Sequence, residues 1–166
     1  MAGEKIIKPV PITPEAFKKF GKLIMIKHQV KPFDDGEMAT AWLDVVEFDA
    51  APRTTILLTT KRRPMVVEKM ERHLKTAEWW TMIDGRCVAT FAEGKHLGAA
   101  DDEPDPSKIV AFIMDGVAGY LTNPGVWHWP AFPISDTTTQ FVEVRVGTVE
   151  EDIHIKELAA PVTIKP

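Results

Sequence analysis

Most of the chain beyond residue 50 alternates between short apolar runs and polar turns, a pattern typical of β-strands. The runs are enriched in Val, Ile, Phe and Thr, which suit a pleated, half-buried surface. Asp84-Gly85 and Asp115-Gly116 have the composition of tight turns between such runs. Many short strands in succession predict a closed or double-sheet β architecture rather than an α/β layer fold. The predicted strands are residues 54–60, 86–92, 109–114, 117–121 and 138–146.

The pattern differs near the N-terminus, where one short helix is predicted. Thr13 is a good N-cap, Pro14 suits the first helical turn, and Gly21 suits the position just past the end. Phe17 and Phe20 lie three residues apart and share a face. We expect the helix between Thr13 and Gly21 to dock on the rest of the protein through these two rings.

Residues 65–77 fit two patterns. Their apolar residues have helical spacing, and this spacing alone slightly favours a helix: Val66, Val67, Met70, Leu74 and Ala77. A strand would instead place Glu71 and His73 on one face and Arg72 on the other, because side chains alternate along a strand. We predict a strand from Val66 to His73.

Composition narrows the class of protein. The 166 residues suffice for a single domain, expected to span 1–166, with an ordinary apolar core; 45% are hydrophobic and 27% charged. The net charge of −4 disfavours nucleic acid as a partner. No apolar stretch approaches the length of a membrane span, and the N-terminus has no signal-peptide pattern. We expect a cytoplasmic protein that contacts neither nucleic acid nor membrane.

Two further features are given structural interpretations. Cys87 is the only cysteine, so no internal disulfide can form, and its apolar surroundings favour a buried thiol over a nucleophile. Residues 101–107 are acidic and contain two prolines, and we expect them to form an exposed loop.

One constellation of residues could carry chemistry. Glu71 and His73 would point to the same face of a strand, and Glu78 could return toward them after a bend. Asn123 begins a turn that contains Pro and Gly, and the strand after this turn projects His128. This arrangement resembles the divalent-metal site of cupin barrels, with Glu71 in place of the usual first histidine. Two imidazoles and two carboxylates suit Mn, Fe, Ni or Zn.

The alternative interpretation needs no metal. Glu71 could be a surface charge, and His73 and His128 could be hydrogen-bonded pocket residues. The remaining histidines have polar surroundings and are expected to be exposed: His28, His96 and His154.

Tryptophans gather beside both parts of this constellation. Trp79 and Trp80 follow Glu78, and Trp127 and Trp129 flank His128, whereas Trp42 lies elsewhere in the sequence. This clustering predicts an aromatic-lined cavity for a small molecule.

With these motifs in view, the chain resembles the ureidoglycolate lyase family. Similar segments include residues 11–17, the run Met70-Glu71-Arg72-His73, residues 105–107 and 111–113, and the run Gly125-Val126-Trp127-His128 followed by Pro130. The resemblance implies a homodimeric, all-β, cupin-like double-stranded β-helix (jelly-roll) barrel with a short N-terminal helix. It also implies a strand at residues 65–73.

The resemblance implies a carbon–nitrogen lyase that splits ureidoglycolate into glyoxylate and urea, with no organic cofactor. Such chemistry needs a base, an acid and an electrophile. We assign Glu71 or Glu78 as the base, and His73 and His128 as acid or ligand groups. All four are candidate ligands of one divalent metal. The expected substrate-binding residues are Arg72, Trp80, Asn123 and Trp129.

The chain also departs from the family pattern. Glu78 stands near the family's usual Gln, and Trp129 replaces the second His of its Trp-His-His-Pro motif. A further His and Arg of the family align with Asn123 and Pro124. Two alternatives to the lyase therefore stay open. One is a metal-dependent cupin enzyme that acts on another small oxygenated acid or sugar, and the other is a non-catalytic cupin that binds a small ligand.

Overall fold

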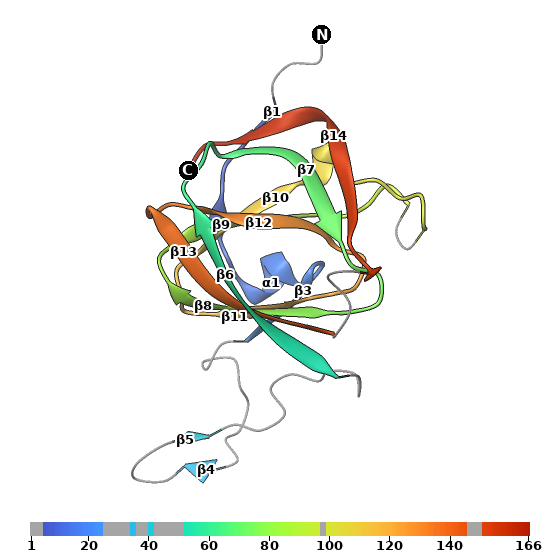
Figure 1. Cartoon of the computed structure of the whole chain (residues 1–166). Coiled ribbons are helices and arrows are strands. Elements are labelled where there is room, and N and C mark those ends of the chain that lie inside the picture. Colours follow the sequence, from blue (N-terminus) through green and yellow to red (C-terminus); the bar gives the residue numbers. More distant parts are fainter. Residues whose placement is uncertain (1–4, 25–33, 36–39, 42–51, 97–98, 146–150) are drawn as a thin grey trace.

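The computed structural model describes residues 5–24, 34–35, 40–41, 52–96, 99–145 and 151–166, and Figure 1 shows the strands of the two larger sheets curving around a common interior. One sheet has seven strands, in the order β1 (Lys5–Ile7), β14 (His154–Ile164), β7 (Val66–Arg72), β12 (Trp127–Pro133), β9 (Cys87–Ala92), β10 (Val110–Met114) and β2 (Val10–Pro11).

A second sheet has five strands, in the order β3 (Gly21–Ile24), β11 (Gly119–Thr122), β8 (Glu78–Asp84), β13 (Thr137–Arg145) and β6 (Arg53–Lys61). Two short strands, β4 (Asp34–Asp35) and β5 (Thr40–Ala41), pair with each other. Among the described residues, the helical elements are α1 (Pro14–Phe17) and the short 3-10 turn η2 (Pro106–Lys108). The expectation of an all-β barrel with a short N-terminal helix is confirmed.

The five strands predicted from apolar runs correspond to β6, β9, β10, β11 and β13, with bounds that differ by one or two residues at most ends. The segment with two possible patterns forms β7, so the strand interpretation is confirmed and the helical pattern was misleading. β7 pairs with β14 on one side and with β12 on the other. This pairing, which runs mainly along β14, overrides the helical spacing of its apolar residues.

The N-terminal helix is shorter than predicted, because it ends at Phe17. Thr13 caps it as expected, and its Oγ1 accepts a hydrogen bond from the amide of Ala16 at 3.2 Å. The assignment of Gly21 as the residue after the helix is wrong. Gly21 begins β3 and pairs with Thr122, and a Cβ on Gly21 would lie 1.7 Å from the Leu121 carbonyl oxygen. Glycine is needed there for close approach of two strands.

Phe17 inserts from α1 into the space between the two sheets. Its ring lies 5.1 Å from that of Phe91, 5.7 Å from that of Phe112 and 5.6 Å from that of Tyr120, measured between centroids. These rings form the centre of the inner core. The seven-stranded sheet also buries its other face, and the residues of this second cluster include Val67, Val88, Ala111, Trp127 and Val162.

Among the described residues, no helix combines the length and apolarity needed to cross a lipid bilayer. Cys87 is fully buried, as predicted. Residues 101–107 do not form a wholly exposed loop, because Asp102 is completely buried. That part of the loop prediction is wrong, and the reason is the ion pair described with the site below.

Candidate metal and active site

Two neighbouring strands of the seven-stranded sheet bring three of the predicted residues together. β7 carries Glu71 and is followed directly by His73, and β12 carries His128 directly opposite Glu71 in the ladder. Side chains alternate along each strand, so these three point into the barrel. Their ligand atoms lie within 4.8 Å of one another.

The turn before β12 aims His128. The amide of Val126 donates to the carbonyl of Asn123 at 3.3 Å, and Gly125 has a φ of 83°. This is the conformation that a Pro-Gly pair favours at the centre of a tight turn. The amide of Gly125 also donates to the carbonyl of His73 at 2.7 Å, which ties the turn to the end of β7.

A bend after His73 brings Glu78 back to the same place, as predicted. Glu78 is the first residue of β8, and its carboxylate contacts both imidazoles. Oε1 lies 3.3 Å from Nε2 of His73, and Oε2 lies 2.9 Å from Nε2 of His128. Nε2 of His128 is in turn 3.9 Å from Oε1 of Glu71. Two histidines and two glutamates thus converge, and we call them the His-Glu cluster.

Backbone carbonyls fix how both imidazoles are oriented. Nδ1 of His128 lies 3.0 Å from the carbonyl oxygen of Val126, and Nδ1 of His73 lies 3.1 Å from that of Asp152. A carbonyl only accepts hydrogen bonds, so each Nδ1 carries a hydrogen and each Nε2 faces the cluster. Metal-binding histidines are commonly held in this way by an outer hydrogen bond.

The cluster is nearly sealed from solvent. The side chain of Glu71 is 14% exposed, and those of the other three are 5–6% exposed. Burial opposes the charge on His128, yet the negative charges of Glu78 and Glu71 outweigh it and raise the His128 pKa to about 9. Burial likewise disfavours ionisation of Glu78, but the positive charge of His128 lowers the Glu78 pKa overall. Burial raises the pKa of Glu71 despite the nearby histidines.

The geometry fits a divalent metal. With bonds of about 2.1 Å, two ligand atoms at right angles lie about 3.0 Å apart and two opposite ones about 4.2 Å apart. The three contacts of 2.9, 3.3 and 3.9 Å fall in this range. Nε2 of His128 and Oε2 of Glu78 are buried and lie 2.9 Å apart as an ion pair. In the metal-free protein the raised pKa of His128 keeps a proton on Nε2, and a bound metal would replace this proton.

Of the predicted substrate-binding residues, Trp80 lies closest to the cluster. It follows Glu78 by two positions on β8, and its ring lies 6.1 Å from that of His128. The Trp80 ring also stacks on that of Tyr120, at 5.9 Å between centroids. Asn123 is exposed in the turn before β12.

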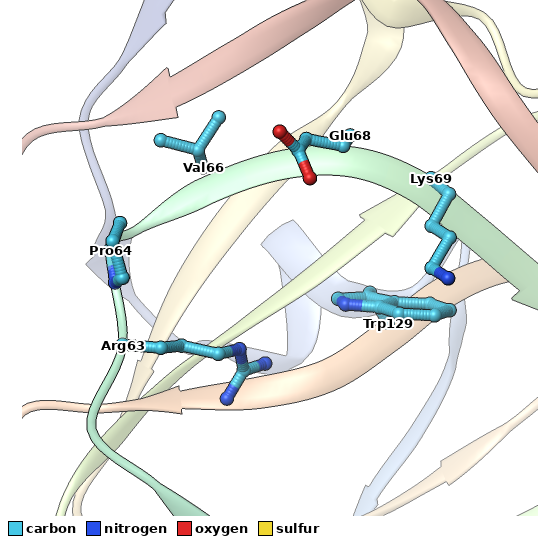
Figure 2. Close-up of a pocket in the computed structure, with 6 residues that line it drawn as sticks. All are labelled: Arg63, Pro64, Val66, Glu68, Lys69 and Trp129. Carbon is cyan, nitrogen blue, oxygen red and sulfur yellow. The ribbon is translucent and has the colours of Figure 1, made fainter.

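The structure corrects the prediction for Arg72 and Trp129, because strand alternation turns both away from the cluster. Arg72 forms a buried ion pair with Asp102. Trp129 packs against the second hydrophobic cluster and lines an outer pocket of about 370 Å³ with Lys69 and Arg63. Figure 2 shows the Lys69 ammonium over the Trp129 indole, 5.2 Å from its centroid.

Among the residues that the structure describes, most of the tryptophans predicted to line the cavity therefore lie away from the cluster. Trp79 lines a separate pocket outside β8, and Trp127 is buried on the same outer face as Trp129. Tryptophans adjacent in sequence to a ligand necessarily face the other side of a strand. Trp42 and His28 lie outside the described residues. His96 is exposed, as expected, and the side chain of His154 is 40% exposed beside Asp152.

Sequence analysis missed a buried aspartate that supports the site. Asp152 is 2% exposed, its carbonyl faces His73, and its Oδ2 accepts a hydrogen bond from the amide of Lys75 at 2.7 Å. It therefore holds the first part of the bend that leads to Glu78. Its acidic surroundings in the sequence resemble those of a surface loop, and no motif distinguishes it.

Comparison with known proteins agrees with the resemblance noted in the sequence. Residues 4–165 match the family described as Ureidoglycolate lyase. The ureidoglycolate lyase of Salmonella typhimurium (strain LT2) is 23% identical over 146 residues, which cover 85% of this chain and 88% of that protein. That of Salmonella enteritidis PT4 has the same identity over the same length.

Solved structures show weaker similarity. RmlC from Streptococcus suis, in complex with dTDP-D-xylose, has a TM-score of 0.36 and 11% identity, over 56% of this chain and 43% of that one. Oxalate decarboxylase from Bacillus subtilis has a TM-score of 0.41 and 17% identity, over 66% of this chain and 24% of that one. The chain thus spans less than half the length of either structure.

Proposed function

The chain belongs to the ureidoglycolate lyase family, and we propose that its His-Glu cluster cleaves ureidoglycolate into glyoxylate and urea. It is a ureidoglycolate lyase-like enzyme, and the match covers residues 4–165. The observation that carries the proposal is the convergence of two imidazoles and two carboxylates in a nearly sealed interior. Perturbed titratable groups gathered in this way are typical of active sites.

The cluster is well suited to hold one divalent metal, Mn, Fe, Ni or Zn. His73, Glu78 and His128 make the two shortest contacts of the cluster and would be its ligands, whereas Glu71, 3.9 Å from Nε2 of His128, would stay free beside the ion. Bound there, the ion would act as a Lewis acid on a substrate oxygen. The outer hydrogen bonds of both Nδ1 atoms keep the two Nε2 atoms directed at one point.

Glu71 is the group best placed to move the proton. Its side chain is the most exposed of the four, and burial raises its pKa, which makes the carboxylate a stronger base. In the proposed reaction Glu71 takes the proton of the C2 hydroxyl while the carbon–nitrogen bond breaks and its electron pair goes to the urea nitrogen. The same carboxyl group then returns the proton to this nitrogen. This step completes urea, and glyoxylate and urea are the two products.

One observation favours a second candidate, a metal-dependent enzyme acting on another small oxygenated acid. Glu78 stands where the family usually has Gln, and its carboxylate contacts both imidazoles. An added negative charge in the cluster favours a tightly held cation over the binding of an anionic substrate. A non-catalytic protein with a bound ligand would share the cluster but release no product.

Glyoxylate release from ureidoglycolate tests the function directly. The purified protein is stripped of metal, reloaded in turn with Mn²⁺, Fe²⁺, Ni²⁺ or Zn²⁺, and assayed for glyoxylate. We expect Glu78→Gln to lose metal binding, and Glu71→Gln to keep the metal while kcat falls about 10²- to 10⁴-fold. No glyoxylate with any metal would overturn the lyase, and loss of metal in Glu71→Gln would make Glu71 a ligand rather than the base.

Further parts of the proposal concern assembly and location. A homodimer is supported by apolar side chains on the outer surface of the five-stranded sheet, where Leu57 is 62% exposed and Phe141 44%. Light scattering of the purified protein measures its mass, and a monomer at micromolar concentration contradicts the dimer. We also propose the cytoplasm, a small-molecule substrate, and no nucleic acid or membrane partner, in keeping with the composition.

A further inference from the structure

The outer face of β7 and β12 holds a buried charged network whose members alternate with the His-Glu cluster. Arg72 lies between two members of the cluster on β7, and Trp127 directly precedes His128 on β12. Asp102 joins them, because its Oδ2 accepts hydrogen bonds from Nη1 of Arg72 and from Nε1 of Trp127, each at 3.0 Å. One carboxylate oxygen thus links the two strands that carry the candidate ligands.

The network is buried and has several hydrogen-bond partners. Arg72 and Asp102 are 1% and 0% exposed, and the guanidinium carbon of Arg72 lies 4.7 Å from the centroid of the Trp127 ring. Nη2 of Arg72 donates to the carbonyl of Ala99 at 2.7 Å, and Oδ1 of Asp102 accepts from the amide of His96 at 2.6 Å. A buried ion pair needs this number of partners to offset its desolvation.

Gly94 provides the space that Asp102 occupies. A Cβ on Gly94 would lie 1.7 Å from Oδ2 of Asp102, the oxygen that bridges the two strands. The lack of a side chain at position 94 therefore leaves room for the carboxylate that links Arg72 to Trp127.

The backbone alone ties the two strands weakly at this point. Within the described part of the chain, the ladder pairs β12 with β7 at a single position, His128 opposite Glu71. One further hydrogen bond, from the amide of Gly125 to the carbonyl of His73, lies beside it. With so few ladder bonds, the spacing of the strands depends on the side chains that link them.

We propose that Arg72, Asp102 and Trp127 are positioning residues that hold β7 and β12 at the spacing that assembles the His-Glu cluster. Outer groups that orient ligands commonly change metal affinity about 10- to 100-fold when altered. The inference rests on the proposed metal site only for this affinity measurement. The side chains of these three residues lie together on the outer face of the sheet, opposite the cluster.

The test compares Trp127→Phe with Val162→Ala. Trp127→Phe removes one N–H donor to Asp102, and Val162→Ala removes two methyl groups from the same buried outer face without touching the network. Asp102→Asn is a stronger variant, but it leaves Arg72 without its counter-ion and could prevent folding. Calorimetry gives the Kd for Mn²⁺, and thermal unfolding of the same samples gives Tm.

We expect Trp127→Phe to raise the Kd for Mn²⁺ about tenfold, whereas Val162→Ala lowers Tm at least as much and leaves Kd unchanged. Equal Kd values in wild type and Trp127→Phe would overturn the inference while the metal site stands. If the wild type binds none of Mn²⁺, Fe²⁺, Ni²⁺ and Zn²⁺, the proposed metal site fails, and the imidazole ¹⁵N shifts of His73 and His128 in metal-free protein decide. If these shifts change in Trp127→Phe but not in Val162→Ala, the positioning role is upheld. If they are unchanged in Trp127→Phe, it is overturned.

Discussion

The substitution Glu78→Gln in metal-free protein tests the electrostatics of the His-Glu cluster. Burial opposes the charge on His128, but the carboxylates of Glu78 and Glu71 raise its pKa from 6.5 to about 9, and Glu78 is the larger cause. A pKa raised by folding stabilises the folded protein. This contribution is fully present below pH 6.5 and is lost as the pH rises through about 9.

The magnitude follows from the two pKa values. The difference between 6.5 and about 9 corresponds to about 3 kcal/mol of unfolding free energy. Urea unfolding in the presence of EDTA, at about pH 6 and about pH 9.5, measures it. We expect the wild type to lose most of this free energy between the two pH values. Glu78→Gln removes the main negative charge at the same volume, so its unfolding free energy should change much less.

Glu68→Gln is the matched control. Glu68 also lies on β7, but its side chain is exposed and lines the outer pocket rather than the cluster. It makes the same change of charge and should keep the wild-type dependence on pH. The reasoning is refuted if Glu78→Gln loses as much stability over this range as the wild type does. In that case the charge of Glu78 does not hold His128 protonated.

Three further predictions need one comparison each. His128→Ala should sharply reduce metal content measured by elemental analysis, whereas His96→Ala should leave it unchanged; equal content would remove His128 from the ligands. Burial raises the pKa of the Cys87 thiol to about 12, so a thiol reagent at neutral pH should modify Cys87 only after unfolding, and rapid native labelling contradicts its burial. Phe17→Ala should cost about 3–5 kcal/mol in urea unfolding, and Leu57→Ala, on the surface, less than about 0.5 kcal/mol; similar losses would contradict the inner core described for Phe17.

Local pattern predicts the β class and most strands here because their runs are short, apolar and separated by turns. It fails for β14, an eleven-residue strand in which Lys156, Glu157 and Pro161 interrupt the apolar residues. A register shift between Glu157 and Val162 in its pairing with β7 adds to the irregularity. Such a strand is specified by its partners in the sheet, which sequence alone does not identify.

The segment that forms β7 shows the limit of periodicity. Its apolar residues satisfy a helical period, and the burial along the strand is itself irregular, because Val67 and Met70 share a face although they are three residues apart. The irregularity falls beside the register shift opposite β14. Strand alternation does hold from Met70 to His73, where it separates Glu71 and His73 from Arg72. We predicted a strand for this segment from the family resemblance, and not from the pattern of apolar residues.

Asp102 could not be predicted for a different reason. Its acidic, proline-containing neighbours are typical of an exposed loop, and its burial depends on Arg72 and Trp127, which are distant in the sequence. A charge is buried only where its partner is buried with it.

The whole chain as one domain, residues 1–166, stays a prediction.

Two of the departures from the family pattern, at Trp129 and Glu78, have unequal consequences for the site. Trp129 follows His128 directly on β12, so its side chain lies on the outer face, and a histidine at this position would not point into the cluster either. Glu78 is different, because its two carboxylate oxygens face Nε2 of His73 and Nε2 of His128. A glutamine of the same shape would present one amide nitrogen there, which cannot ligate a cation and would need an acceptor. The change at position 78 therefore alters the charge of the cluster itself, and it is the residue at which this chain's metal affinity and choice of substrate should differ from those of its relatives.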